Sequence, residues 1–208
     1  MTNFQKRILT SIIILPLSIF FIVRGGYFLN FFLIFIFFAG FHELFSVFKE
    51  KKSILLLSLI FILSLFSIYY LREKAEMLLY LAISVSISSD IGGYIFGKTF
   101  KWKKLTKISP KKTISGVFGS YFLSIICLYI FFNTLASEDY NISFSYLIIT
   151  IIFSTVAQIG DITISYFKRL EKIKDTGKIL PGHGGIFDRI DGLMFVVILS
   201  SIIHISGI

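Results

Sequence analysis

The chain has 208 residues, of which 55% are apolar and 16% are charged, against about 25% charged residues in ordinary soluble domains. With a mean hydropathy of +0.84, this composition excludes a soluble domain and predicts an all-α, polytopic transmembrane helical bundle. A net charge of +9 is compatible with nucleic-acid binding, but the Lys and Arg residues fall in loops between apolar segments. We therefore expect them to contact the lipid headgroups of a bilayer, and we expect no nucleic-acid partner.

Seven apolar segments follow one another along the chain, at about 8–23, 27–47, 53–71, 77–97, 115–135, 143–167 and 191–206. A helix needs about 20 residues to cross the hydrocarbon core, so the first and last segments are marginal. Seven spans is the favoured count, and six or eight stay open. Lys6 and Arg7 precede the first segment as in a signal peptide, but no small-residue cleavage site follows it. We expect this segment to be an uncleaved helix.

Positive charge is distributed unevenly over the alternating loops. With a cytoplasmic N-terminus, the inside segments hold 18 of the 21 Lys and Arg residues, and the outside loops hold the other three. Because cytoplasmic loops carry an excess of Lys and Arg, this count predicts a cytoplasmic N-terminus. The two longest inside loops are then 98–114 and 168–190. The apolar segments beside them contain Asp90 and Asp161, and acids at membrane depth are expected to face a polar cavity.

A dense run of charged residues begins on the sixth apolar segment. Asp161 is followed by Ser165, Lys168 and Arg169 at helical spacing, so that on a helix all four share one face. An acid at membrane depth is thus followed by a hydroxyl and two cations as the helix reaches the predicted cytoplasmic side. Asp175 lies in the short polar loop that comes next.

A glycine-rich turn, Pro181-Gly182-His183-Gly184-Gly185, precedes the last apolar segment. Bare backbone can approach a ligand closely and point N–H groups at phosphate oxygens. Asp188, Arg189 and Asp191 follow where the last helix should begin, and a helix N-terminus favours anions. Carboxylates beside several cations are typical of metal-assisted phosphoryl or nucleotidyl transfer, because oxygen ligands hold Mg²⁺ and the cations neutralise triphosphate charge.

The other long loop contains a second polar patch, Ser109-Pro110-Lys111-Lys112-Thr113. The proline breaks any helix there, and two adjacent lysines with two hydroxyls would make a cradle for a triphosphate. Upstream, Asp90 stands beside Gly92 and Gly93. Such small residues allow close helix packing or close approach of a ligand.

The run from Ser165 to Asp191 resembles the signature of the phosphatidate cytidylyltransferases, also called CDP-diacylglycerol synthases. The matching residues, all at the spacing of that signature, are Ser165, Lys168-Arg169, Lys174-Asp175, Pro181, His183-Gly184-Gly185 and Asp188-Arg189-x-Asp191. Gly160-Asp161, the run at 109–113, and Asp90 with Tyr94 also resemble family features. There are two departures. Ser115 stands where the family often has Glu, and the chain is short, so we expect one or two N-terminal spans to be missing.

The resemblance implies an enzyme of phospholipid biosynthesis in which phosphatidate and CTP give CDP-diacylglycerol and pyrophosphate. It implies Mg²⁺ as the cofactor, held by Asp161 and Asp188, with a second cation such as K⁺ left open. It also implies a homodimer that crosses the cell inner (cytoplasmic) membrane several times. Residues 1–208 are expected to form one integral membrane domain, with N-terminal helices in 1–76 and catalytic helices and cytoplasmic loops in 77–208.

The candidate site residues divide into two groups. A catalytic role, in metal binding or in stabilising phosphate charge, is expected for Asp161, Asp188, Lys168, Arg169, Asp175, His183, Arg189 and Asp191. Substrate binding is expected for Asp90, Ser109, Lys111, Lys112, Thr113, Ser165, Gly184 and Gly185. For Asp175 and Asp191 a structural role stays open. His183 is expected to orient or hydrogen-bond a phosphate, because a phosphate nucleophile is already ionised at neutral pH and hardly needs a base.

Two other functions stay open. A CTP-dependent lipid kinase, such as a polyprenol kinase, would transfer the γ-phosphate instead of CMP, and the complete His-Gly-Gly-x-x-Asp-Arg-x-Asp run disfavours it. An ion-coupled transporter would use Asp90 and Asp161 and would spread its acids across the membrane depth in repeated halves. Here the charges gather at one predicted face, and the sequence contains no obvious internal repeat.

Overall fold

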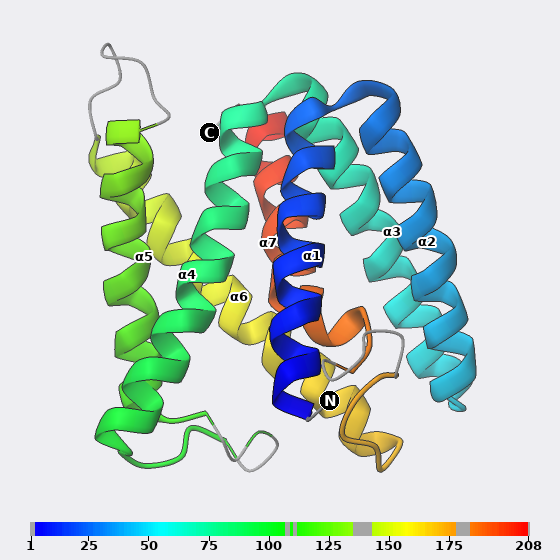
Figure 1. The fold of residues 1–208 in the computed structure, drawn as a ribbon. Helices are drawn as coiled ribbons and strands as arrows, with labels where there is room; N and C mark the ends of the chain where they lie inside the picture. The colour runs from blue at the N-terminus through cyan, green and yellow to red at the C-terminus, as the bar shows by residue number, and fades with distance from the viewer. Residues whose placement is uncertain (1–2, 107–108, 110–111, 135–142, 178–183, 208) are drawn as a thin grey trace.

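The computed structural model describes residues 3–106, 109, 112–134, 143–177 and 184–207. This part of the chain forms seven α-helices (Figure 1), namely α1 (Asn3–Arg24), α2 (Gly26–Val47), α3 (Lys51–Lys74), α4 (Glu76–Phe100), α5 (Ile114–Thr134), α6 (Phe144–Leu170) and α7 (Phe187–Ser206). Each predicted apolar segment is one of these helices, with ends that differ by a few residues. The described residues contain no β-strand beyond one isolated antiparallel bridge, so the all-α prediction is confirmed.

Six of these helices, α2 to α7, are long and apolar enough to cross a membrane, and the described part of α1 adds a shorter apolar helix, Ile12–Arg24. Large apolar side chains cover the outside of the bundle. Phe35, Phe38 and Leu55, for example, are 58%, 67% and 74% exposed. A soluble protein rarely exposes so much apolar surface, whereas lipid tails cover it readily. The chain is therefore a multi-pass helical membrane protein.

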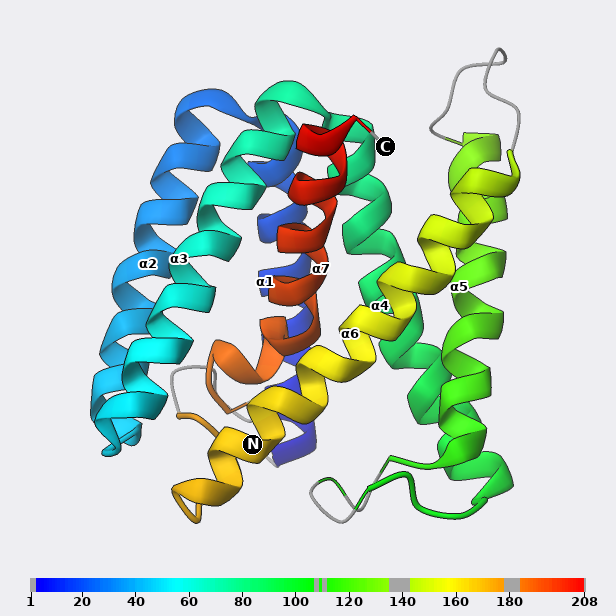
Figure 2. The ribbon, with the colours of Figure 1, turned by 180° about the vertical axis from the view of Figure 1, so that it is seen from behind.

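One helix, α6, runs diagonally across the bundle (Figure 2). It begins beside α5, and beyond its other end Glu171 accepts hydrogen bonds from the backbone N–H groups of Lys49 and Glu50, at 3.0 and 2.8 Å. The described parts of the loops at 101–113 and 171–186 lie at the end of the bundle where α1 begins. This arrangement agrees with the expected pair of loops on one side, and their cytoplasmic location stays a prediction.

Helices α4 and α5 pack with their backbones in contact. A Cβ atom added to Gly92 would overlap the carbonyl oxygen of Gly119, and one added to Gly119 would lie 2.5 Å from the carbonyl oxygen of Gly92. Both positions therefore require glycine. The expectation that the small residues after Asp90 allow close helix packing is confirmed. As a result, Asp90 lies next to the first turns of α5.

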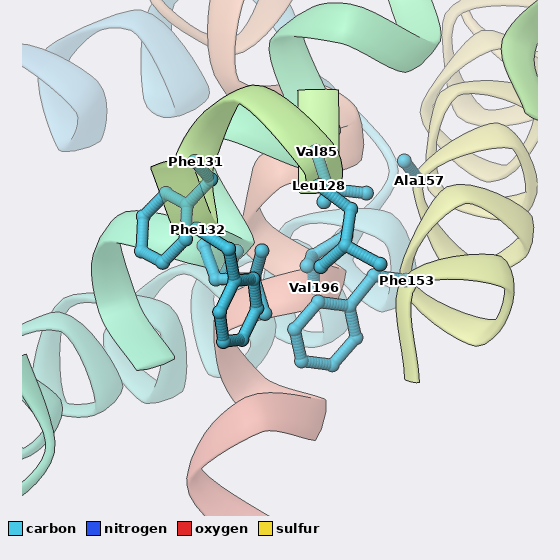
Figure 3. Packing of buried hydrophobic residues seen from close by; sticks show 9 residues of the cluster. Val85, Leu128, Phe131, Phe132, Phe153, Ala157 and Val196 are labelled. Carbon is cyan, nitrogen blue, oxygen red and sulfur yellow. The ribbon is translucent and has the colours of Figure 1, made fainter. Parts of the chain in front are cut away.

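Three apolar clusters among the described residues hold the helices together. Figure 3 shows the first cluster, in which Val85 of α4, Leu128 of α5 and Phe153 of α6 meet Val196 of α7. The second cluster lies between α2, α3, α6 and α7, and its buried members are Leu44, Phe48, Leu57, Phe61, Ile164, Phe187 and Met194. Because Phe187 is the first residue of α7, this packing holds the start of α7 against three other helices.

We expect Gly119→Ala to lower the thermal unfolding temperature of the detergent-solubilised protein, because the added methyl group must push α4 and α5 apart. Overpacking of this kind costs about 1–3 kcal/mol. Ser124→Ala on the same helix is the matched control, since it removes a buried hydroxyl that has no hydrogen-bond partner among the described residues. If Gly119→Ala unfolds at the same temperature as the unaltered protein, α4 and α5 do not pack with their backbones in contact at Gly119.

Candidate active site

A cavity of about 210 Å³ opens between α4, α5, α6 and the loop that precedes α5. Its lining residues are Asp90, Gly93, Tyr94, Leu105, Ser109, Lys112, Thr113, Gly116, Val117, Ser120, Gln158 and Asp161. Five of them come from the predicted site, namely Asp90, Ser109, Lys112, Thr113 and Asp161. The structure thus brings three separate parts of the chain around one cavity. Asp90 and Asp161 both border this cavity, as acids at membrane depth are expected to do.

The loop before α5 folds back on itself and carries Lys112 to the cavity. The backbone N–H of Leu105 donates a hydrogen bond to the carbonyl oxygen of Lys112 at 2.8 Å. The N–H of Ile114 donates to the carbonyl oxygen of Lys103 at 3.0 Å. These two bonds pair the segment after α4 with the residues just before α5, so Lys112 is held by backbone contacts on both sides.

Thr113 begins α5 as its N-cap. Its Oγ1 accepts a hydrogen bond from the backbone N–H of Gly116 at 3.1 Å and lies 3.0 Å from the hydroxyl oxygen of Ser115. A Ser or Thr at this position satisfies one of the free N–H groups at a helix start. Thr113 therefore has a structural task beside the substrate contact predicted for it. Ser115, at the position of the family's Glu, is buried against this cap.

Lys112 holds Asp161 inside the cavity. Its Nζ lies 2.8 Å from Asp161 Oδ2 and also donates to the carbonyl oxygen of Gln158 at 3.1 Å. The Lys112 and Asp161 side chains are 24% and 16% exposed, so each charge has lost most of its water and needs the other. Asp161 Oδ1 is buried and has no hydrogen-bond partner among the described residues. An unpaired buried acceptor is costly, so a further ligand would be stabilised there.

Glycines let α6 and α7 cross beside Asp161. A Cβ atom added to Gly192 would lie 2.8 Å from Asp161 Oδ1, and one added to Gly160 would lie 3.0 Å from the carbonyl oxygen of Asp191. The carboxylates of Asp90, Asp161 and Asp191 lie close enough for their charges to interact. Even so, no three His, Cys, Asp or Glu side chains in the described part of the chain converge closely enough to hold a metal ion by themselves.

Asp188, in the first turn of α7, joins α6 to the loop that precedes α7. Its Oδ1 accepts a hydrogen bond from Lys168 Nζ at 2.8 Å. Its Oδ2 accepts from the backbone N–H groups of Thr176 and Gly185, at 2.8 and 3.0 Å. The Lys168 and Asp188 side chains are 10% and 7% exposed, and the helix N-terminus also favours the negative charge. Asp188 thus determines where this loop and Lys168 lie.

The two acids predicted to bind metal lie on neighbouring helices. Asp188 comes one helical turn before Gly192, and the Gly192 backbone packs against Asp161. One turn corresponds to about 5.4 Å along α7. A carboxylate has roughly four acceptor positions, and Asp188 uses three of them for Lys168 and the two backbone N–H groups. One position on Asp188 and the unpaired oxygen of Asp161 are left for a hard cation.

A second buried carboxylate, Glu43 of α2, holds the other side of the loop before α7. It accepts hydrogen bonds from Thr176 Oγ1 and from the backbone N–H groups of Ile186 and Phe187, the last two at 2.6 and 3.2 Å. Glu43 is 1% exposed. Glu43 is not among the residues that the sequence predicted for the site. The signal for it is an acid inside an apolar segment, since such an acid must find partners in the folded protein.

Two of the predicted catalytic residues lie at the solvent side of this loop. Arg169 is exposed, and its guanidinium donates to the carbonyl oxygen of Ile173 at 2.9 Å. Asp175 is exposed as well, and a Cβ atom added to Gly184 would lie 3.5 Å from its Cβ. Gly184 has a φ of 89°, a backbone conformation that favours glycine. This turn of the signature therefore needs glycine for its shape.

The structure places three of the remaining predicted residues without testing their roles. Ser165 is half-buried on α6, and Arg189 is exposed in the first turns of α7. Gly185 donates its N–H to Asp188, so this group serves the loop. Lys111 and His183 lie outside the described residues. The roles of all five toward substrate stay predictions.

Residues 92–99 match the GxxxxGK[ST] pattern of phosphate-binding loops. The structure places them inside α4, where backbone N–H groups donate to carbonyl oxygens of the preceding turn. Such groups cannot surround a phosphate as a loop between a strand and a helix does. Gly92 packs on α5, and a Cβ atom added to Gly97 would lie 3.0 Å from Thr113 Oγ1. The pattern therefore reflects helix packing and is not a nucleotide-binding loop.

The fold and the site define a multi-pass membrane protein whose buried acids and lysines gather at one end of the bundle, around a cavity and a glycine-containing loop. Residues 53–206 match the model of the Cytidylyltransferase family. The match covers most of the chain, and the protein belongs to this family.

Curated relatives show the same likeness. The phosphatidate cytidylyltransferase of Staphylococcus saprophyticus is 42% identical over 142 residues, which cover 66% of this chain and 54% of the relative. The proteins of the same name from Staphylococcus epidermidis and Staphylococcus aureus are each 40% identical, over 141 and 143 residues. The chain thus spans about half the length of the curated relatives it matches, 54% in each case.

We expect Lys112→Met to destabilise the protein, because it leaves the Asp161 carboxylate without its cation. The double variant Lys112→Met/Asp161→Asn should be more stable than the sum of the single changes predicts, with a coupling of about 0.5–3 kcal/mol. Thermal unfolding in detergent with a chelator present measures all three variants. Lys74 is exposed and is the last residue of α3. The changes in stability caused by Lys74→Met and Asp161→Asn should therefore add. Additivity in both pairs would contradict the ion pair.

Proposed function

We propose that this protein is a phosphatidate cytidylyltransferase, which transfers CMP from CTP to phosphatidate and releases pyrophosphate. The observation that carries the proposal is the meeting of Lys112 and Asp161 at one cavity, near the start of α7, where Lys168 pairs with Asp188. The family match and the curated relatives of that name support the same reaction.

The reaction joins two anionic substrates. A phosphate oxygen of phosphatidate attacks the α-phosphorus of CTP, and a new P–O bond forms. The bond between the α-phosphorus and the oxygen that bridges to the β-phosphate breaks, and pyrophosphate leaves with the bonding electrons. The attacking phosphate is already ionised at neutral pH. The protein therefore has to bring the substrates into line and neutralise the charge that develops on the leaving group.

Two lysines, Lys168 buried and Lys112 half-buried, are suited to this neutralisation. Lys112 Nζ holds Asp161 and the Gln158 carbonyl oxygen, and Lys168 Nζ holds Asp188. An ammonium group has three donors, so each lysine keeps at least one for a phosphate oxygen. The carboxylates hold the lysines in place before substrate arrives, which reduces the entropy lost on binding. We propose Arg169 and Arg189, exposed at the same end of the bundle, as further phosphate contacts.

Mg²⁺ is the cofactor that we propose, bound by Asp161 and Asp188. The unpaired Asp161 Oδ1 and the remaining acceptor position of Asp188 support this assignment. Mg²⁺ prefers oxygen ligands and is commonly bound through one or two carboxylates together with substrate phosphates, so two acids suffice. When bound, the ion would polarise phosphate oxygens and lower the repulsion between the two substrates.

We further propose that the protein lies in the inner (cytoplasmic) membrane as a homodimer, with the end that carries the site facing the cytoplasm. The excess of Lys and Arg in the loops at this end supports the orientation. The resemblance to the family supports the dimer, which cross-linking in native membranes would test. On this view the four helices α4 to α7 carry most of the reaction site, and α1 to α3 support it.

Incubation of the purified protein with phosphatidate, Mg²⁺ and labelled CTP tests the reaction. An α-phosphate label should appear in a liponucleotide, and a γ-phosphate label should appear in free pyrophosphate, because CMP is the group transferred. Mass spectrometry of the extracted lipid identifies the product. A γ-label in the lipid would contradict the proposal and indicate a CTP-dependent lipid kinase.

Asp188→Asn should lower the rate of this reaction by at least about 100-fold, because it removes a charge from the proposed Mg²⁺ site. The variant should still insert into membranes and purify as the unaltered protein does. Glu73→Gln removes an exposed carboxylate in the last turn of α3 and should leave the rate unchanged. Near-normal turnover by Asp188→Asn would refute the metal assignment.

A further inference from the structure

The donors that surround Glu43 belong to the loop before α7 and to the first residue of α7. Thr176 Oγ1 and the N–H groups of Ile186 and Phe187 donate to the Glu43 carboxylate. The carboxylate lies in a bundle of apolar helices and is 1% exposed. A carboxylate in such surroundings is stable only when several donors reach it together. The loop and Glu43 therefore determine each other's position.

The same loop also supplies the two backbone donors of Asp188. Thr176 donates its hydroxyl to Glu43 and its backbone N–H to Asp188. Gly185 donates its N–H to Asp188, and the next N–H along the chain, that of Ile186, donates to Glu43. The loop is thus held between two carboxylates, one from α2 and one from α7. A shift on the Glu43 side must move the donors that hold Asp188.

Two glycines of this loop leave the space that Glu43 occupies. A Cβ atom added to Gly185 would overlap the Oε1 atom of Glu43, and one added to Gly177 would lie 3.2 Å from its Cδ. Neither glycine has a positive φ, so backbone freedom does not explain them. The close approach of the Glu43 carboxylate explains why a side chain is excluded at Gly185, the second glycine of the His-Gly-Gly signature.

We infer that Glu43 is a positioning residue of the site, which holds the loop before α7 so that Asp188 and Lys168 face the reacting phosphates. Glu43 acts through Thr176 and Gly185 and does not itself contact substrate. It lies ahead of the segment 53–206 that matches the family model, so α2 contributes to the site from outside that segment. The catalytic part of this inference rests on the proposed function, and the structural part does not.

Hydrogen exchange tests the structural part without any reaction. Glu43→Gln keeps the size of the side chain but turns an amide NH₂ group toward donors, so at least one hydrogen bond is lost. The amides of Thr176 and of residues 185–187 should exchange at least about 10-fold faster, while those in the middle of α7 stay protected. Unchanged exchange at these amides would overturn the inference, whatever the activity of the variant.

Thr176 provides a second pair of variants if Glu43→Gln does not fold. Thr176→Val keeps the buried volume and removes the hydroxyl, whereas Thr176→Ser keeps the hydroxyl and removes a methyl group. The inference predicts fast exchange at residues 185–187 in Thr176→Val and retained protection in Thr176→Ser. If Thr176 contributed only by packing, exchange would be faster in Thr176→Ser than in Thr176→Val. That result would overturn the inference.

Kinetics test the catalytic part. Glu43→Gln should lower kcat by about 10–100-fold, as loss of a supporting contact does, and should raise the Mg²⁺ concentration for half-maximal rate. The KM for phosphatidate should change little. The double variant Glu43→Gln/Thr176→Val should lower kcat by less than the product of the two single fold-changes, because both changes break the same hydrogen bond between Thr176 and Glu43.

Glu171→Gln is the matched control, because Glu171 also accepts two backbone N–H groups of another segment, but its described side-chain hydrogen bonds do not involve Asp188 or the donors of Asp188. It should leave kcat and the Mg²⁺ dependence unchanged. Faster exchange in Glu43→Gln with unchanged kcat and Mg²⁺ dependence would overturn the inference. If the unaltered protein forms no liponucleotide, the proposed function fails, and the exchange data alone decide whether Glu43 positions the loop.

Discussion

Carboxylates buried among apolar helices must each find donors, and this requirement shapes the end of the bundle that carries the site. Asp161 binds Lys112, Asp188 binds Lys168 and two backbone N–H groups, and Glu43 binds a threonine hydroxyl and two backbone N–H groups at the start of α7. A buried charge without a partner would cost several kcal/mol, which is a large share of a protein's net stability. The loops therefore take the conformations that bring donors to these acids, and the lysines lie where phosphates would need them.

Helix packing decides where these acids can meet. The diagonal course of α6 lets one helix present Asp161 to the cavity near α5 and Lys168 to the loop near α2. Glycines at 92 and 119 bring α4 against α5, and Gly160 and Gly192 bring α6 against α7. Lipid offers no hydrophobic drive for helices to associate, so close backbone contact and interhelical polar contacts supply the attraction. The polar site and the tight helix contacts are thus parts of one arrangement.

Several residues that look like ligand contacts in the sequence have structural partners in the fold. Thr113 caps α5, Gly185 makes room for Glu43, and the GxxxxGK[ST] pattern at 92–99 is a packed helix. A structural partner does not exclude a substrate contact, since a hydroxyl or ammonium group has more than one hydrogen-bonding position. The site and the fold thus place requirements on the same residues.

The sequence by itself determined the seven helices, the membrane class and the family, because long apolar segments and a signature of charged residues at fixed spacing are properties of the chain read in order. It also indicated most of the polar residues of the site. Only the tertiary structure decided which of them are neighbours: that Lys112 faces Asp161, that Lys168 faces Asp188, and that Glu43 lies under the loop before α7. Periodicity shows which face of a helix is polar but not what that face meets, since this depends on the tilt of α6 and on the glycine contacts between helices that lie far apart in the chain.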